Sequence, residues 1–124
     1  LDTIVATNLH ADIISDLAAA LAGSIGIAPT ANLNPERHFP SMFEPIHGSA
    51  FDITGKGIAN PIGTFWTACM MLDHLGETEA SSCLMSAIEQ ITADERFHTP
   101  DLGGRACTDD VTVAVIDAIS VSSI

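Results

Sequence analysis

The sequence is short of positive charge. Lysine and arginine together number 4, against 16 aspartates and glutamates, which gives a formal net charge of −12. A chain with this balance repels the phosphates of nucleic acids and anionic lipids, so neither is expected as a partner. The cationic residues are also too far apart in the sequence to predict a site that binds a carboxylate through bidentate hydrogen bonds. These residues are Arg37, Lys56, Arg96 and Arg105. We therefore expect a metal ion, or arginines from elsewhere, to hold any anionic substrate.

Cysteine and long apolar runs are scarce as well. The three cysteines, Cys69, Cys83 and Cys107, are odd in number and far apart, which fits neither a disulfide framework nor a zinc knuckle. No apolar run reaches the roughly 18 residues that a membrane span needs. With 47% hydrophobic residues in 124, the chain is expected to be one folded, soluble unit with reduced thiols in the cytoplasm.

The first part of the chain predicts a strand followed by a helix. Residues 1–7, LDTIVAT, are typical of a buried strand, and no initiator methionine precedes them, so we expect a piece of a longer protein. Residues 11–22 predict a helix with one apolar stripe, formed by Ile13, Leu17, Ala20 and Leu21. Glycines and Pro29 then predict an irregular loop that runs to about residue 41.

The remainder predicts further helices around a short strand. We expect a strand over 42–46, a glycine-rich loop over 47–59, and a helix that Asn60-Pro61 begins and that runs to about residue 75. A second helix is expected over 78–94. A last helix is expected to begin after Thr108, which would be its N-cap. Strands separated by helices predict an α/β fold. The predicted strands are too few to complete a sheet covered by helices on both faces, so further strands or a partner are expected to complete it.

Two aspartates are candidates for a metal site. Asp12 and Asp16 stand four apart on the predicted helix, which places their Cβ atoms about 5–6 Å apart on one face. The two like charges repel, and Mg²⁺ or Mn²⁺ would relieve the repulsion because both ions prefer carboxylate and water oxygens. The alternative is a solvated helix face, with Asp12 favoured near the helix N-terminus.

The glycine-rich loop carries groups suited to a nucleotide. In FEPIHGSAFDITGKGIANP, glycines allow close approach of a ligand, Asp52 can accept both ribose hydroxyls, and Asn60 can donate and accept at an adenine edge. No G-x-G-x-x-G follows the strand, so this is not the Rossmann fingerprint. From the residues alone, a nucleotide site and a purely structural loop both remain open.

These segments resemble a known family. VATNLHADIISDLAAALAGSIGIAPTANLNPE together with FEPIHGSAFDITGKGIANP resembles the isocitrate/isopropylmalate dehydrogenase family, and NLNPER points to its tartrate/D-malate dehydrogenase branch. The resemblance implies an isopropylmalate dehydrogenase-like chain, the C-terminal segment of a two-domain α/β fold that is not a Rossmann fold. Residues 1–22 would end the dimerisation and metal domain, and residues 23–124 would form the C-terminal part of the cofactor-binding domain.

The resemblance also implies roles for particular residues. Asp12 and Asp16 would bind Mg²⁺ or Mn²⁺. NAD would be bound by the loop and its flanks, namely Glu44, His47, Gly48, Ser49, Ala50, Asp52 and Asn60. An acidic residue at position 52 implies NAD rather than NADP, because a carboxylate would repel the 2′-phosphate of NADP.

The implied reaction is oxidation, with decarboxylation, of a small 2-hydroxy dicarboxylic acid such as tartrate or D-malate by a cytoplasmic homodimer. The family's lysine and tyrosine acid/base pair, its substrate arginines and a third metal aspartate lie upstream of this segment. No catalytic residue is therefore assigned here, and the segment alone is expected to be inactive. Two alternatives stay open: 3-isopropylmalate dehydrogenase, and a non-catalytic regulatory subunit that binds a nucleotide or metal.

Two positions depart from the family pattern. His10-Ala11 replaces the usual Phe-Gly before the first metal aspartate, and Phe51 replaces a proline. His10 could be an extra metal ligand or could pack against the domain crossing. Phe51 could stack on adenine or fill the loop.

Overall fold

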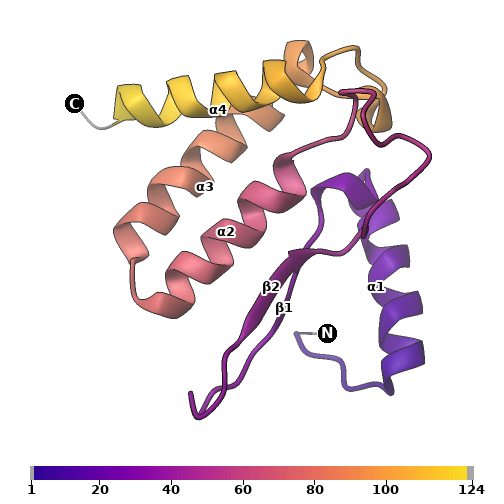
Figure 1. Ribbon diagram of the computed structural model, residues 1–124, viewed down its shortest axis with the longest axis vertical. Helices are drawn as coiled ribbons and strands as arrows, with labels where there is room; N and C mark the ends of the chain where they lie inside the picture. The colour runs from indigo at the N-terminus through magenta and orange to yellow at the C-terminus, as the bar shows by residue number, and fades with distance from the viewer. Residues whose placement is uncertain (1, 123–124) are drawn as a thin grey trace.

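The chain folds as a layer of three helices with a hairpin and a fourth helix beside it (Figure 1). The computed structural model describes residues 2–122, and the side chains of residues 2–120. The helices are α1 (Asn8–Ala22), α2 (Ile62–Leu75), α3 (Thr78–Thr92) and α4 (Thr108–Ser122), and the strands are β1 (Pro29–Asn32) and β2 (Met42–Pro45). Short 3₁₀ turns, η1 (Ile25–Ile27), η2 (Glu95–Phe97) and η3 (Pro100–Leu102), connect them.

The core lies where α2, α3 and α4 meet. Val111 and Val115 are each only 1% exposed, and their spacing of four places them on the same face of α4. Burying such a side chain contributes about 1.5–3 kcal/mol. The same cluster takes apolar residues from α2, α3 and the segment before α4, among them Ile62, Cys69, Ala87, Ile88, Ile91 and Ala106. These contacts hold the three helices as one layer.

The N-terminus of α2 is fixed against η1. The side-chain Oδ1 of Asn60 accepts the backbone N–H of Ile62 at 3.0 Å, in agreement with the predicted helix start. A Cβ at Gly63 would lie 2.7 Å from the carbonyl oxygen of Gly26, so only glycine allows the helix to come this close. The start of α2 and η1 therefore form one rigid corner.

The N-terminus of α4 is capped one residue earlier than predicted. The backbone N–H of Cys107 donates to Oδ2 of Asp110 at 2.8 Å, and the N–H of Asp110 donates to Sγ of Cys107 at 3.4 Å. This reciprocal pair has the form of a capping box. The hydroxyl of Thr108, the expected cap, instead donates to the carbonyl oxygen of Ala59 at 2.6 Å. Thr108 thereby ties α4 to the glycine-rich loop.

The strand predictions need two corrections. Residues 2–7 form no strand; they are exposed and no strand lies beside them in the described chain, so their backbone groups have no partners to complete a ladder. The loop predicted up to residue 41 contains β1, which pairs antiparallel with β2 from Pro29–Pro45 to Asn32–Met42. This hairpin is the whole of the sheet over residues 2–122, as the scarcity of predicted strands led us to expect.

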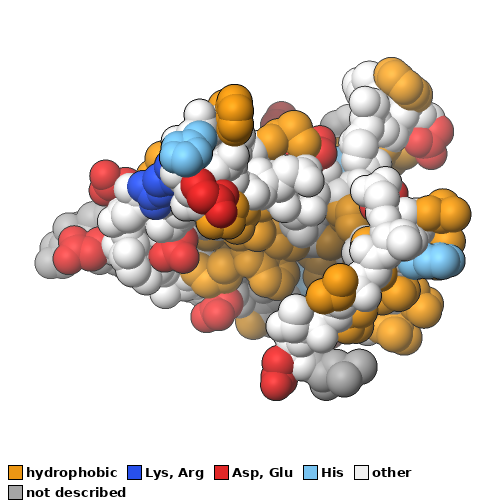
Figure 2. Space-filling model, turned by 90° about the horizontal axis from the view of Figure 1, so that it is seen from below, with side chains coloured by type: hydrophobic (Ala, Val, Ile, Leu, Met, Phe, Trp, Pro, Cys, Tyr) orange, Lys and Arg blue, Asp and Glu red, His pale blue; other side chains and the backbone are white. Residues whose placement is uncertain are grey.

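The apolar face of α1 is uncovered. In the predicted stripe, Ile13, Leu17 and Leu21 are 58%, 59% and 82% exposed, and Ala20 is exposed as well. The buried residue of the helix is Ala19. Figure 2 shows apolar side chains across the hollow of one face and toward the side where α1 lies. Monomeric proteins rarely expose contiguous apolar patches of large size. None of the described helices is long and apolar enough to cross a membrane.

Candidate functional site

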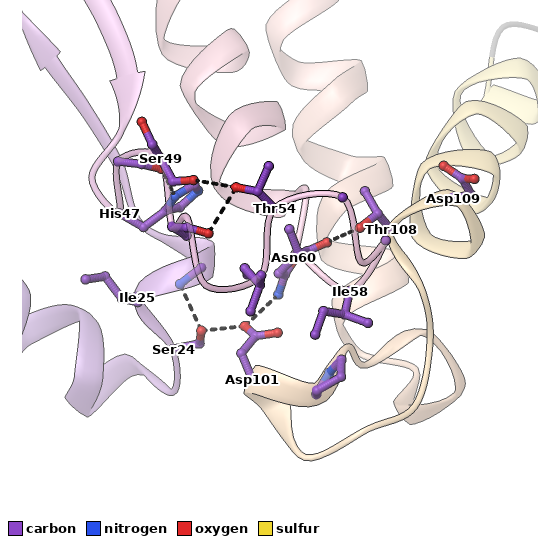
Figure 3. A pocket seen from close by; sticks show the side chains of 18 residues that line it. Ser24, Ile25, His47, Ser49, Thr54, Ile58, Asn60, Asp101, Thr108 and Asp109 are labelled. Carbon is purple, nitrogen blue, oxygen red and sulfur yellow. Dashed lines mark hydrogen bonds between the residues drawn. The ribbon is translucent and has the colours of Figure 1, made fainter.

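A cavity of about 630 Å³ lies among the glycine-rich loop, η1, η3 and the start of α4 (Figure 3). Its walls come from three regions that are far apart in the chain, namely 24–26, 47–60 and 100–109. The lining residues are 24–26, 47–50, 53–55, 57–60, 100–101 and 108–109. The corner between η1 and α2, and the bonds of Thr108, hold these stretches together.

Most of the predicted cofactor residues line this cavity. His47, Gly48, Ser49, Ala50 and Asn60 are all part of the lining. The structure therefore brings these loop residues and Asn60, which were predicted to bind one cofactor, to the wall of the same cavity.

Glu44 and Asp52 do not line it. Glu44 is exposed on β2, opposite Thr30. Asp52 is exposed in the turn between Ala50 and Ile53, both of which do line the cavity. Asp52 therefore belongs to the same loop as the lining but is not itself part of the cavity wall.

The loop is held in a tight conformation. Ala50 has a φ of 41°, in the left-handed region that costs a non-glycine residue of order 1–3 kcal/mol. Its carbonyl oxygen accepts the N–H of Ile53 at 3.0 Å and the hydroxyl of Thr54 at 3.3 Å. Such strain is typical of loops that are shaped for a ligand.

His47 keeps one ring nitrogen available. Its Nδ1 lies 2.8 Å from the carbonyl oxygen of Gly48, and because a carbonyl oxygen can only accept, Nδ1 must carry the hydrogen. In the neutral ring Nε2 is then an acceptor at the cavity wall.

The Asn60 amide is oriented by the protein. Asn60 is only 7% exposed, and its Oδ1 bonds to the N–H of Ile62. Its Nδ2 donates to Oδ2 of Asp101 at 3.1 Å. Both ends of the amide are therefore engaged, which leaves one side-chain N–H for a ligand.

Asp101 is a site residue that the sequence did not reveal. Its carboxylate accepts hydrogen bonds from the hydroxyl of Ser24 and the amide of Asn60 (Figure 3), and also from the hydroxyl of Thr99. Burial alone would raise the pKa of Asp101, but the hydrogen bonds from Ser24, Thr99 and Asn60 outweigh it and lower the pKa below its usual value. The charged carboxylate thus ties η1, the start of α2 and η3 together.

Removing the Asp101 charge should make the fold less stable and less sensitive to acid. A carboxylate with a lowered pKa stabilises the fold above its unfolded pKa of about 4, and this contribution is lost as the pH falls through the folded value. We expect Asp101→Asn to lower the unfolding free energy near pH 7 by about 1 kcal/mol and to flatten its pH dependence below about pH 4. Urea denaturation at several pH values checks this, with the exposed Asp117→Asn as control. Identical pH dependence in wild type and Asp101→Asn would contradict it.

The two candidate metal ligands lie on one exposed face of α1. Asp12 and Asp16 are both exposed, and Asp12 Oδ2 lies 3.5 Å from Nδ2 of Asn8. His10 does not join them; its Nδ1 lies 3.0 Å from the hydroxyl of Thr7. Over the described residues, no three histidine, cysteine, aspartate or glutamate side chains are grouped to hold a metal. The two carboxylates still fit Mg²⁺ or Mn²⁺, which take one or two protein carboxylates and complete their shell with other oxygens.

All three cysteines are free thiols. Cys69 is 2% exposed in the core, and burial raises the pKa of its thiol. Such a thiol packs as a small apolar group.

The sequence comparisons find relatives over the whole chain. The family model described as isocitrate/isopropylmalate dehydrogenase matches residues 1–119. The chain is 71% identical over 124 residues to a probable tartrate dehydrogenase/decarboxylase of Agrobacterium vitis, covering 100% of this chain and 34% of that protein. It is 53% identical over 123 residues to the decarboxylating D-malate dehydrogenase of Escherichia coli (strain K12), covering 95% of this chain and 34% of the relative.

Solved structures have the same fold over most of the chain. An isocitrate dehydrogenase from Methylococcus capsulatus matches with a TM-score of 0.84 at 39% identity, covering 91% of this chain and 33% of that one. The apo form of a beta-decarboxylating dehydrogenase from Thermococcus kodakarensis matches with a TM-score of 0.79 at 47% identity, covering 91% and 32%. The chain thus spans about a third of the length of its relatives, and the predicted fold, a segment of a larger isopropylmalate dehydrogenase-like α/β fold, is confirmed. The chain belongs to the isocitrate/isopropylmalate dehydrogenase family.

Proposed function

We propose that this chain is part of an oxidoreductase that uses NAD and Mg²⁺ or Mn²⁺ to oxidise and decarboxylate a small 2-hydroxy dicarboxylic acid. Tartrate and D-malate are the proposed substrates, because relatives of these names match the chain. The observation that carries the proposal is the cavity lined by His47, Ala50 and Asn60 at the start of α2.

The cavity suits the adenosine end of NAD. Its volume of about 630 Å³ is within the range of ordinary ligand pockets. Apolar side chains such as Ile25 and Ile58 give the cavity an apolar surface. His47 Nε2 and the remaining side-chain N–H of Asn60 offer polar contacts to a ligand. We propose that Asp52, outside the lining, accepts the ribose hydroxyls, and that Glu44 contributes at the far end of the loop.

The metal would be held by Asp12 and Asp16. When bound, it would chelate the substrate's hydroxyl and carboxylate and favour loss of the hydroxyl proton. The role of this chain is to place the two carboxylates relative to the cavity. From Asp16 to Ala22 the helix advances roughly 9 Å along its axis, and η1 at the cavity wall follows directly.

The proposed domain assignment rests on the family to which the chain belongs. We propose that residues 1–22 end the dimerisation and metal domain and that residues 23–124 form the C-terminal part of the cofactor-binding domain. The uncovered stripe of Ile13, Leu17 and Leu21 would then pack against the rest of the parent protein or its second subunit in a homodimer. The catalytic acid and base would come from outside this chain, which contains no tyrosine.

The proposal is tested on the full-length protein and on the isolated segment. We expect the full-length protein to reduce NAD when supplied with tartrate or D-malate and Mn²⁺, measured as formation of NADH. The isolated 124 residues should show no turnover, because the acid/base pair and substrate arginines are expected elsewhere. Turnover by the pure segment would contradict this division of the site.

The same assay separates the alternatives. Reduction of NAD with 3-isopropylmalate in place of tartrate and D-malate would replace the substrate assignment. Binding of NAD without turnover of any of the three acids would indicate a non-catalytic regulatory subunit. Failure of the full-length protein to bind NAD would overturn the proposed function itself.

A further inference from the structure

The side-chain amide of Asn60 is held in one orientation. Its Oδ1 lies 3.0 Å from the backbone nitrogen of Ile62, whose N–H can only donate. Its Nδ2 lies 3.1 Å from Oδ2 of Asp101, and an ionised carboxylate can only accept. Turning the amide over would place two acceptors together at Asp101 and two donors together at Ile62, so both hydrogen bonds would be lost. Held in this way, Asn60 keeps one side-chain N–H as a donor to a ligand in the cavity that it lines.

The Asp101 carboxylate is itself fixed by two further donors. The hydroxyl of Ser24 donates to Oδ2, the same oxygen that accepts from Asn60, and the hydroxyl of Thr99 donates to Oδ1. Figure 3 shows the connection from Ser24 through Asp101 to Asn60. Ser24 is 7% exposed and Thr99 is 0% exposed, so both donors are held in place by their surroundings. The carboxylate therefore cannot turn away from Asn60 without losing its other hydrogen bonds.

The backbone of η1 leaves room for this contact. A Cβ at Gly26 would lie 2.8 Å from Oδ2 of Asp101 and 3.1 Å from Cβ of Asn60. Any larger residue at position 26 would therefore displace one of the two side chains. The N–H of Gly26 also donates to Oγ of Ser24 at 2.9 Å, which holds η1 against the same carboxylate. Asp101 and Asn60 thus meet at a place that three separate segments of the chain keep open for them.

We propose that Asp101 is a positioning residue for the cofactor, which holds Asn60 so that the free N–H of its amide donates to a ring nitrogen of adenine. The inference rests on the proposed function, because it concerns the same nucleotide site. The ring nitrogens of adenine carry lone pairs that accept hydrogen bonds, and a C–H group in the same place cannot accept one. Asp101 acts through Asn60 and needs no contact of its own with the cofactor.

The first test is Asp101→Leu in the full-length protein, which keeps a side chain of similar shape but offers no acceptor. We expect the KM for NAD to rise about threefold to tenfold, the effect of about one hydrogen bond. The kcat should stay about the same, because a contact with adenine contributes equally before and during hydride transfer. Asp101→Asn should keep most of the affinity, because the amide oxygen of that variant still accepts from Asn60 and Ser24. A rise in KM as large in Asp101→Asn as in Asp101→Leu would contradict the positioning role.

Two further variants separate positioning from a structural role. Thr99→Val removes the donor to the other oxygen of Asp101 and lies outside the cavity lining, so it should lower the unfolding free energy but leave the KM for NAD unchanged. In Asn60→Ala, the added change Asp101→Leu should raise KM no further, because the group that Asp101 positions is already gone. An equal rise in KM with and without Asn60, or the same rise in Thr99→Val, would overturn the inference.

Deaza analogues of adenosine test the contact on the wild-type protein. Three deazaadenosines, each with a C–H group in place of one ring nitrogen, are compared with adenosine as inhibitors competitive with NAD. We expect one of the three to bind about threefold to tenfold more weakly than adenosine, and this difference to shrink in Asp101→Leu. Equal inhibition of the wild type by adenosine and all three analogues would overturn the inference while NAD binding, and with it the proposed function, stands. Failure of the wild type to bind NAD would instead overturn both.

Discussion

Replacing Asp16 by alanine should reduce Mn²⁺-dependent turnover of the full-length protein by at least about a hundredfold. Loss of a group that merely orients a metal ligand typically costs 10–100-fold, and loss of a ligand itself should cost more. Asp16 shares one exposed face of α1 with Asp12, and the described chain offers no third carboxylate or histidine to take its place. Turnover should therefore fall with the metal affinity, and excess Mn²⁺ should restore part of it.

The matched control is Asp73→Ala. Asp73 is an exposed aspartate near the end of α2, where a negative charge is not favoured by the helix dipole, so its removal should leave both the fold and the metal response intact. Titration of Mn²⁺ against turnover measures both variants. If turnover depends on Mn²⁺ concentration in the same way in Asp16→Ala and Asp73→Ala, the assignment of the metal site to α1 is wrong.

The helices were predictable because their signals are local. Asn60-Pro61 marks the start of α2, and Gly76, with a φ of 90°, ends it. Apolar residues at helical spacing, such as Val111 and Val115, predict which face of α4 is buried. The cap of α4 was misplaced by one residue because Cys107 is a less common cap than Thr108, which bonds across the structure to Ala59.

The strands were harder to predict because a strand depends on a partner. Residues 29–32 are too few to show a period of two, and Pro29 at their start suggests a turn. They become β1 because β2 lies beside them. Residues 2–7 have strand-like composition but no such neighbour in the described chain. Composition therefore predicts a tendency to extend, while pairing decides whether a strand forms.

The part of the candidate site that is continuous in sequence was predictable as one unit. The loop from His47 to Asn60 carries its glycines and polar groups in one stretch, and the structure brings most of them to one cavity. Asp101 could not be found in this way. Its hydrogen-bond partners Asn60 and Ser24 are 41 and 77 residues away in the sequence, so no local pattern links them. The sequence around Asp101 predicts only a turn.

Substituting lysine for Asp52 should lower kcat/KM for NAD relative to NADP by about tenfold to a hundredfold. A hydrogen bond to a charged group is worth about 1.5–3 kcal/mol, and each 1.4 kcal/mol corresponds to a factor of ten. The carboxylate of Asp52 is exposed and bonds to no other side chain in the described part of the protein, so it is available to the ribose hydroxyls. Steady-state rates with both cofactors give the ratio.

The matched control for Asp52→Lys is the same charge change at an exposed aspartate of α2. Asp73→Lys, an equal charge change on α2, should leave the ratio as it is. If the ratio in Asp52→Lys equals that of the wild type, Asp52 does not contact the ribose, and selection against NADP rests on other residues.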